Sequence, residues 1–308
     1  MIDRRELLLL AENLGLQPQV VEKDYVLGWL LAGIRDNADL GDHWVFKGGT
    51  CLKKCYLETY RFSEDLDFTI INEAHLDQAF LTKAFSDISA WIYEQTGLEI
   101  PADRLRFDVF RNKRERLACE GRIYYRGPIA PRGGDLPRIR LDLTTDEVLA
   151  LPPVERPVVH SFSDEPEGGI KALCYAYEEV FGEKVRALGE RARPRDLYDV
   201  VNLFRHEEFQ PQPAAILDVL KRKCAYKGIQ CRPWIRSRLF MKNCPATGRR
   251  CLRISSPRYR HWHPFGMFCR SSSPGWPAVR APPRCHPILS QPGKQFCDSR
   301  SVPTPVPA

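Results

Sequence analysis

Residues 45–68 read VFKGGTCLKKCYLETYRFSEDLDF, and this stretch holds the residues that decide the fold. The apolar run Trp44–Phe46 predicts a short buried strand. Gly48 and Gly49 follow it, and because glycine has no Cβ, the backbone there can approach a ligand closely. We expect a short helix after Thr50, whose first turn would offer free N–H groups and a positive dipole end to a phosphate.

The second half of the stretch ends in Asp65-Leu66-Asp67-Phe68, which predicts another strand. Alternate residues of a strand share a face, so Asp65 and Asp67 point one way and Leu66 and Phe68 point into the core. Two carboxylates on one face repel each other unless a cation lies between them. Such a pair suits Mg²⁺, which proteins bind through one or two carboxylates together with substrate phosphates.

The order strand, Gly-Gly-Thr, helix and Asp-x-Asp strand resembles the signature of the DNA polymerase beta-like nucleotidyltransferases. In that superfamily the Gly-Gly-Ser/Thr turn lies on the triphosphate and the aspartate pair carries the metal ions. The fuller string, with Arg61-Phe62-Ser63 before Asp65, resembles the AbiEii/AbiGii toxin branch. The resemblance implies nucleotide binding by the residues Lys47, Gly48, Gly49, Thr50, Arg61 and Ser63. Taken alone, a Gly-Gly pair is most often a turn and an Asp-x-Asp pair is often only solvated.

A third carboxylate lies in the predicted strand from Arg138 to Thr144. Alternation places Arg138, Arg140 and Asp142 on one face and three apolar residues on the other. Nucleotidyltransferases complete their metal site with a carboxylate from a nearby strand. The resemblance therefore implies that Asp142 is a catalytic residue and metal ligand together with Asp65 and Asp67. An ion pair with Arg138 or Arg140 is the alternative.

A second motif follows later in the chain, Glu183-Lys184-x-x-Ala and then Arg193-Pro194-Arg195-Asp196-Leu197-Tyr198-Asp199. We expect one helix over Lys171–Gly189 and another with Pro194 in its first turn. Asp196 would then complement the helix dipole, and this role plus a salt bridge would account for it. The motif also resembles the second diagnostic motif of the toxin family. That resemblance implies a nucleotide-binding role for Lys184 and a catalytic role for Asp196, and it covers about residues 21–226.

Two other enzyme classes fit the sequence poorly. Arg195-Asp196-Leu197 is similar to the catalytic loop of protein kinases, but the asparagine of that loop should fall at position 201, which is Val201. No Asp-Phe-Gly follows, and Gly48-Gly49 lacks the ending of a Walker A loop. A non-catalytic nucleotide- or RNA-binding protein, inactivated by a C-terminal frameshift, remains the alternative.

The composition changes abruptly near residue 229. From Gln230 onward the chain has 14 basic residues against the single acid Asp298, and it holds 13 of the 25 prolines. Such a step marks a boundary. We expect an α+β fold, a nucleotidyltransferase-type mixed sheet flanked by helices, with a helical C-terminal part and a disordered tail. The predicted domains are N-terminal helices over 1–40, the nucleotidyltransferase core over 41–165, a helical domain over 166–228 and an aberrant or disordered basic tail over 229–308.

The tail allows two interpretations. An arginine-rich segment is typical of a nucleic-acid-binding arm. Enrichment in Trp, Cys, Arg, Pro and Ser with almost no acid is also what out-of-frame reading of a GC-rich gene gives, and we favour this frameshift hypothesis. Its cysteines lack zinc-ligand spacing, so a zinc site is not expected.

The function predicted from the sequence is metal-dependent nucleotidyl transfer. The resemblance implies Mg²⁺ as cofactor, a nucleoside triphosphate as substrate, an RNA acceptor such as a tRNA 3′ end, and a cognate antitoxin. No apolar run of 18 residues and no secretory signal occurs, so we expect a cytoplasmic protein without a membrane span. A basic rim suited to RNA phosphates is predicted on two loops, at Arg111, Lys113, Arg114, Arg116, Arg126 and Arg132; the alternative is solvated hairpin tips.

The tail interpretation predicts a protease-sensitive boundary. A segment that buries little apolar surface cannot offset its ordering entropy, roughly 1–2 kcal/mol per residue for the backbone alone. Limited proteolysis should therefore cut between about Lys227 and Arg238, and the alternative reading frame past Gly228 should encode an amphipathic, acid-containing continuation. A protease-resistant tail, with early stops in that frame, would instead identify the tail as a genuine RNA-binding arm.

Overall fold

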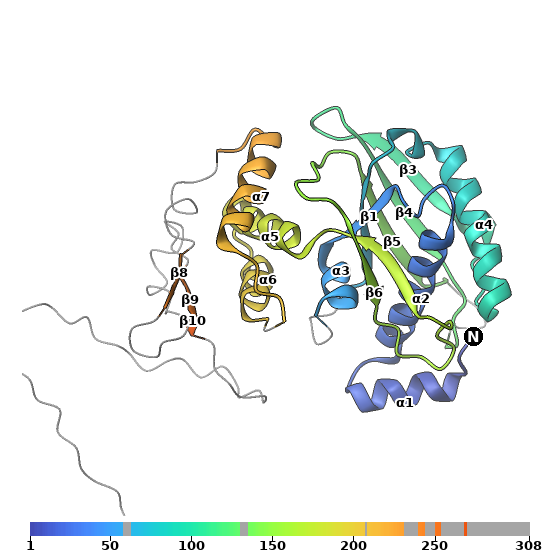
Figure 1. The fold of residues 1–308 in the computed structure, drawn as a ribbon. Helices are drawn as coiled ribbons and strands as arrows, with labels where there is room; N and C mark the ends of the chain where they lie inside the picture. Colours follow the sequence, from blue (N-terminus) through green and yellow to red (C-terminus); the bar gives the residue numbers. More distant parts are fainter. Residues whose placement is uncertain are drawn as a thin grey trace, which may run out of the picture. The chain divides into compact units, whose positions relative to one another are not determined.

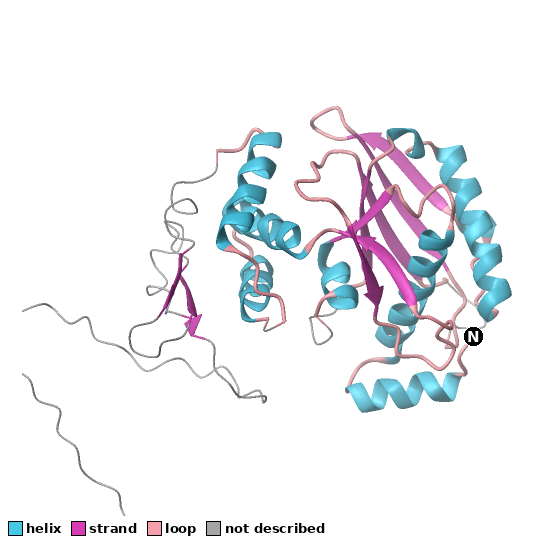
Figure 2. Ribbon diagram, viewed as in Figure 1, coloured by secondary structure: helices cyan, strands magenta, loops and turns pink. Residues whose placement is uncertain are grey.

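The computed structural model describes residues 1–57, 63–129, 135–206 and 208–230, and the backbone of three short strands at 240–243, 250–253 and 268–269 (Figure 1). Helices accompany a sheet that contains both parallel and antiparallel strand pairs, drawn in cyan and magenta in Figure 2, so the predicted α+β class is confirmed. None of the helices among these residues is both long and apolar enough to cross a membrane.

A seven-stranded mixed sheet forms the centre of the fold, in the order β3-β4-β5-β2-β1-β7-β6. The β2–β5 and β1–β7 pairs are parallel and the other neighbours are antiparallel. The strands are β1 (Trp44–Lys47), β2 (Asp65–Ile70), β3 (Arg106–Arg111), β4 (Leu117–Tyr124), β5 (Arg138–Thr144), β6 (Val154–Val158) and β7 (Ile170–Cys174).

Seven α-helices accompany the sheet in the described part of the chain. They are α1 (Arg4–Leu14), α2 (Pro18–Asp36), α3 (Gly48–Cys55), α4 (Gln78–Thr96), α5 (Tyr177–Arg191), α6 (Pro194–Arg205) and α7 (Pro213–Tyr226). Two short 3₁₀ helices, η1 (Glu73–His75) and η2 (Ala102–Arg104), precede α4 and β3. Local signals set the ends of α4: the Asp77 side chain accepts the N–H of Phe80, and Gly97 ends the helix in the left-handed conformation.

The apolar face of the sheet packs against α2 and α4, and this packing orients the strands. Phe46 and Phe68 are register partners on β1 and β2, and both are fully buried. Trp44 contacts Phe68 and also Phe85 of α4, with ring centroids 5.5 and 6.0 Å apart. Burial of each such aromatic side chain contributes about 1.5–3 kcal/mol. Since Leu66 and Phe68 point into this core, as predicted, Asp65 and Asp67 must lie on the opposite face.

The predicted helix over Lys171–Gly189 is wrong in its first part. Residues 170–174 form strand β7, in which Ile170, Ala172 and Cys174 are buried and Lys171 is exposed. The alternation of apolar and polar residues that indicates a strand is short here, and the larger apolar residues that follow have helical spacing. The whole segment was therefore predicted as one helix. Helix α5 starts only at Tyr177, so part of the segment assigned to a helical domain belongs to the central sheet. Strand β6, which holds Pro157, was not predicted; its place at the sheet edge explains why proline is tolerated.

Three short strands lie within the predicted tail. They are β8 (Phe240–Asn243), β9 (Arg250–Arg253) and β10 (Phe268–Cys269), and they form a small antiparallel sheet of their own. The rest of the predicted tail beyond residue 230 lies outside the described residues. The boundary at residue 229 and the frameshift hypothesis therefore stay predictions.

Candidate active site

A row of charged side chains crosses four neighbouring strands on the polar face of the sheet. Lys47 on β1 is the register partner of Asp67 on β2, Asp67 is paired with Asp142 on β5, and Asp142 is paired with Glu120 on β4. Neighbouring strands of a sheet lie about 4.8 Å apart, so register partners on them are in close proximity. Asp67 and Asp142, far apart in the sequence, are therefore direct neighbours, and both are partly buried. Asp65 lies on the same face of β2.

Burial and mutual repulsion both disfavour ionisation of these aspartates. Burial raises the pKa of Asp67 to about 6, and the charges of Asp142 and Asp65 add to the shift against the opposing effect of Lys47. Burial also raises the pKa of Asp142, helped by Asp65 and Glu120 and opposed by Arg140 and Lys47. A cation between the carboxylates would relieve this repulsion, so the donor set fits a divalent metal ion.

The glycine turn lies directly against the aspartate row. Gly48 has φ +84°, and a Cβ at this position would lie only 2.0 Å from Oδ2 of Asp67. Glycine is thus required here for two reasons, its backbone conformation and the space occupied by the carboxylate. Gly49 is buried in the first turn of α3. The buried Thr50 hydroxyl donates to the Asp65 carbonyl at 2.5 Å, so it ties α3 to β2.

The second motif reaches the same site through Lys184. This buried lysine forms an ion pair with Asp199 of α6 at 2.9 Å, and its charge also opposes the rise in the pKa of Asp67. Asp196 has different partners. Its carboxylate forms two hydrogen bonds with Arg191, at 2.8 and 2.9 Å, and accepts the N–H of Arg193 at 3.4 Å. Burial opposes ionisation of Asp196, but the Arg191 guanidinium outweighs it and lowers its pKa.

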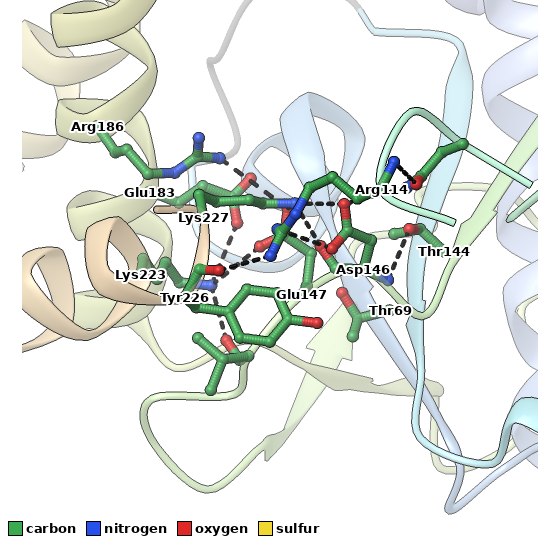
Figure 3. A network of polar contacts seen from close by, with 12 residues as sticks. Thr69, Arg114, Thr144, Asp146, Glu147, Glu183, Arg186, Lys223, Tyr226 and Lys227 are labelled. Carbon is green, nitrogen blue, oxygen red and sulfur yellow. Dashed lines mark hydrogen bonds and ion pairs between the residues drawn. The ribbon is translucent and has the colours of Figure 1, made fainter. Parts of the chain in front are cut away.

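Sequence reasoning missed a fully buried lysine on α7. The Nζ atom of Lys223 lies 2.9 Å from Glu179. It also lies 3.5 Å from Glu183 and 3.9 Å from Glu147, both of which are labelled in Figure 3. It also donates to the carbonyl of Val148 at 3.2 Å. The available signal was its spacing: Lys223 falls on the apolar stripe of α7. A lysine at such a position needs charged partners, because an unpaired buried charge is costly.

Around this lysine, further ion pairs join α7 to the loops beside the sheet. Lys227 pairs with Asp146 at 3.1 Å and with Glu147 at 3.2 Å, as Figure 3 shows. Arg114 pairs with Asp146 at 2.9 Å and donates to the Tyr226 carbonyl at 2.6 Å. Asp146 thus bridges a hairpin of the sheet and helix α7.

The predicted basic rim is partly engaged in contacts within the protein. Besides Arg114, Arg111 donates to the Glu115 carbonyl and Arg126 pairs with Glu99 at 3.3 Å. Arg132 lies outside the described residues, as does the predicted nucleotide-binding residue Arg61. Ser63 is partly buried just before β2.

The carboxylate oxygens of the three predicted metal ligands do not converge on a single preformed site. Among the described residues, a convergence within 4.8 Å of three such atoms occurs only at the buried thiols of Cys51, Cys55 and Cys174. Buried cysteines of this kind pack as small apolar groups. Two neighbouring carboxylates suffice for Mg²⁺ when substrate phosphates supply the other oxygens, which agrees with the Asp67–Asp142 pair.

A mixed sheet with a glycine turn against paired aspartates is the arrangement that we expected of a nucleotidyltransferase from the sequence. Comparison with protein-family models agrees: residues 29–253 match the family described as nucleotidyl transferase AbiEii toxin, type IV toxin–antitoxin system. The match covers more than half of the chain, which therefore belongs to this family. A search of curated proteins finds no match.

Membership of the family identifies the chain as a nucleotidyltransferase and as the toxin of a toxin–antitoxin system. It implies a nucleoside triphosphate substrate, typically a divalent metal, and a cognate antitoxin. The matched region begins after the predicted start at residue 21 and ends beyond the predicted end at 226.

Removal of the buried lysine should destabilise the protein strongly. Lys223→Ala leaves Glu179, Glu183 and Glu147 without their shared counter-charge, and breaking a buried pair from one side costs about 3–5 kcal/mol. Urea unfolding followed by circular dichroism measures this loss. Lys221→Ala, at an exposed position of the same helix, is the matched control and should change stability by about 0.5 kcal/mol or less. Equal stability of the two variants would contradict the burial argument.

The Glu183 carboxylate should give stability a defined pH dependence. Burial opposes its ionisation, but the charges of Lys47 and Lys223 outweigh this and hold its pKa at about 2, below the usual 4.5. A lowered folded-state pKa means that the stabilisation is present above pH 4.5 and is lost as the pH falls towards 2. The destabilisation caused by Glu183→Gln should accordingly be largest above pH 4.5 and shrink at lower pH in urea titrations. A destabilisation independent of pH would show that charge is not its cause.

Proposed function

We propose that this toxin is a metal-dependent nucleotidyltransferase that transfers a nucleotide from a nucleoside triphosphate to an RNA acceptor. The observation that carries the proposal is the direct pairing of Asp67 with Asp142 on neighbouring strands, with the Gly48 turn packed against Asp67. This arrangement puts metal-binding oxygens beside backbone that can approach a phosphate.

The residues proposed to hold Mg²⁺ are Asp67 and Asp142, with Asp65 on the same face. When bound, Mg²⁺ would neutralise charge on the triphosphate and activate the attacking hydroxyl. Lys47 and Lys184, whose charges already act on Asp67, would add positive charge for the phosphates. Gly48 and Gly49 bring the N-terminus of α3 next to them.

The reaction forms a bond between the acceptor hydroxyl oxygen and the α-phosphorus. The bond from that phosphorus to the pyrophosphate oxygen breaks, the hydroxyl releases its proton, and pyrophosphate leaves. Thr50 would support this step by fixing α3 to β2, since its hydroxyl donates to the Asp65 carbonyl. Nucleotide-binding roles for Arg61 and Ser63 remain part of the proposal on the strength of the motif alone.

The proposed acceptor is RNA, and a tRNA 3′ end is our specific candidate, in the cytoplasm. A decisive experiment incubates the full chain with Mg²⁺, each labelled nucleoside triphosphate in turn, and total RNA. Labelled RNA of one size class is the expected product. Absence of labelled product with all four nucleotides would favour the alternative, a non-catalytic nucleotide- or RNA-binding protein.

Asp67→Asn should abolish transfer while the protein stays folded. The substitution removes one charge from the metal site with almost no change in shape, and a lost metal ligand should reduce label incorporation by at least about 100-fold. Asp87→Asn, at an exposed position of α4, is the matched control and should keep full activity. Since burial and repulsion oppose ionisation of Asp67, Asp67→Asn should also melt at a temperature equal to or above that of the parent in EDTA. Normal incorporation by Asp67→Asn would refute the metal assignment.

The second motif can be divided into binding and structural contributions. Lys184→Ala should weaken nucleotide binding, whereas Asp196→Asn should lower turnover more than binding. Because Asp196 is paired with Arg191, Arg191→Gln serves as the matched variant that breaks the same ion pair. Kinetics and thermal melts of all three variants separate the roles. If Asp196→Asn and Arg191→Gln lose only stability and keep specific activity, the Asp196 contact is structural.

A further inference from the structure

A second charged row runs beside the aspartates on the same polar face. Asp65 of β2 is the register partner of Arg140 on β5, Arg140 is paired with Arg122 on β4, and Arg122 with Arg106 on β3. Arg138 lies two residues before Arg140 and so shares its face. We call Arg106, Arg122, Arg138 and Arg140 the arginine row. None of these residues belongs to the basic rim on the loops.

Most of the arginine row is accessible to a ligand. Arg106, Arg138 and Arg140 are exposed, and Arg122 is partly buried. Arg122 forms an ion pair with Asp108 at 2.9 Å. Arg106 donates to the carbonyls of Asp103 and Leu105, and Arg138 donates to the Tyr124 hydroxyl at 3.4 Å. The charge of Arg140 acts on Asp142 and opposes the rise of its pKa.

The row gathers like charges, which the neighbouring acids offset in part, since Arg122 pairs with Asp108 and Arg140 is the register partner of Asp65. Like charges directly opposite each other on neighbouring strands are destabilising, and the row places Arg106, Arg122 and Arg140 side by side across three strands. Neighbouring strands are about 4.8 Å apart, so the guanidinium groups can contact successive groups of an extended anion. Arginine binds phosphate through two parallel hydrogen bonds, which suits a phosphodiester chain.

We propose that the arginine row binds the phosphate backbone of a single-stranded RNA and guides its end to Asp65. The inference deepens the proposed function and rests on it for the identity of the RNA as acceptor. The row begins beside Asp65 and extends over β5, β4 and β3, so a strand bound along it ends at the aspartates. Binding through phosphates carries no sequence information, so the row supplies affinity and direction only.

The test measures binding without chemistry. A fluorescent single-stranded RNA of mixed sequence is titrated with the full chain in EDTA, without nucleotide, at several salt concentrations. For single strands, the logarithm of affinity falls with the logarithm of salt concentration at a slope of about −0.7 per neutralised phosphate. We expect the double variant, Arg106→Gln with Arg138→Gln, to bind RNA more weakly at low salt. Its plot of log affinity against log salt concentration should be shallower by about 1.4, because two phosphate contacts are lost. Arg140→Gln alone should make it shallower by about 0.7.

The matched control is Arg5→Gln, which removes an exposed arginine from α1, away from the sheet, and should leave the slope unchanged. The comparison of variants within the full chain also cancels the contribution of the arginine-rich tail. A slope that is the same in the parent and in the row variants overturns the inference. So does a loss of nucleoside triphosphate binding with RNA affinity unchanged, because the row would then serve the triphosphate.

Failure of this inference is distinguishable from failure of the proposed function. RNA binding that weakens in the row variants supports the inference even if the parent transfers no nucleotide. The inference is refuted if the parent and the double variant, Arg106→Gln with Arg138→Gln, bind RNA with equal affinity and label it equally well. The proposed function then still stands. Thermal melts of Arg106→Gln with Arg138→Gln should lie at or slightly above that of the parent, since both side chains are exposed and their removal relieves like-charge repulsion.

Discussion

The crowding of carboxylates on one partly buried face of the sheet is the constraint on which the rest of this structure depends. Asp67 and Asp142 are direct cross-strand neighbours, and burial raises the pKa of both. Negative charges so placed are stable only where the surroundings supply positive charge or dipoles. The fold supplies Lys47 from the next strand and Lys184 from α5, and both charges oppose the rise in the pKa of Asp67.

The same constraint explains the chain on either side of the first motif. Gly48 can be only glycine, because any side chain would collide with the Asp67 carboxylate. The N-terminus of α3 therefore approaches the aspartates more closely than an ordinary turn allows, and the buried Thr50 hydroxyl fixes it there. The glycine turn and strand β2, for which we propose phosphate and metal binding, are in this way one packed unit, because each fixes the position of the other.

The position of Lys184 depends in turn on buried ion pairs in the helices. Lys223 lies among Glu179, Glu183 and Glu147, and this cluster joins α5 and α7 to the loop after β5. Buried ion pairs are weak sources of net stability, because desolvation offsets most of the attraction. Buried ion pairs nevertheless constrain the positions of the helices, because each buried charge must stay within contact distance of its partners. The cluster thereby connects α5, the helix that carries Lys184, to α7 and to the loop after β5.

The parts of this protein that depend on local pattern could be predicted from the order of its residues alone. Alternation put Asp65 and Asp67 on one face of a strand, and glycine spacing located the turn before them. Strand β7 was not predicted because its short alternation of buried and exposed residues is directly followed by the apolar spacing of helix α5. Burial in the sheet outweighs the local preference for helix there. Only the tertiary structure decided that Lys184 pairs with Asp199 and that Lys223 is buried among glutamates. Such contacts join elements distant in sequence, and no local periodicity records which of many compatible charges will meet when the chain packs.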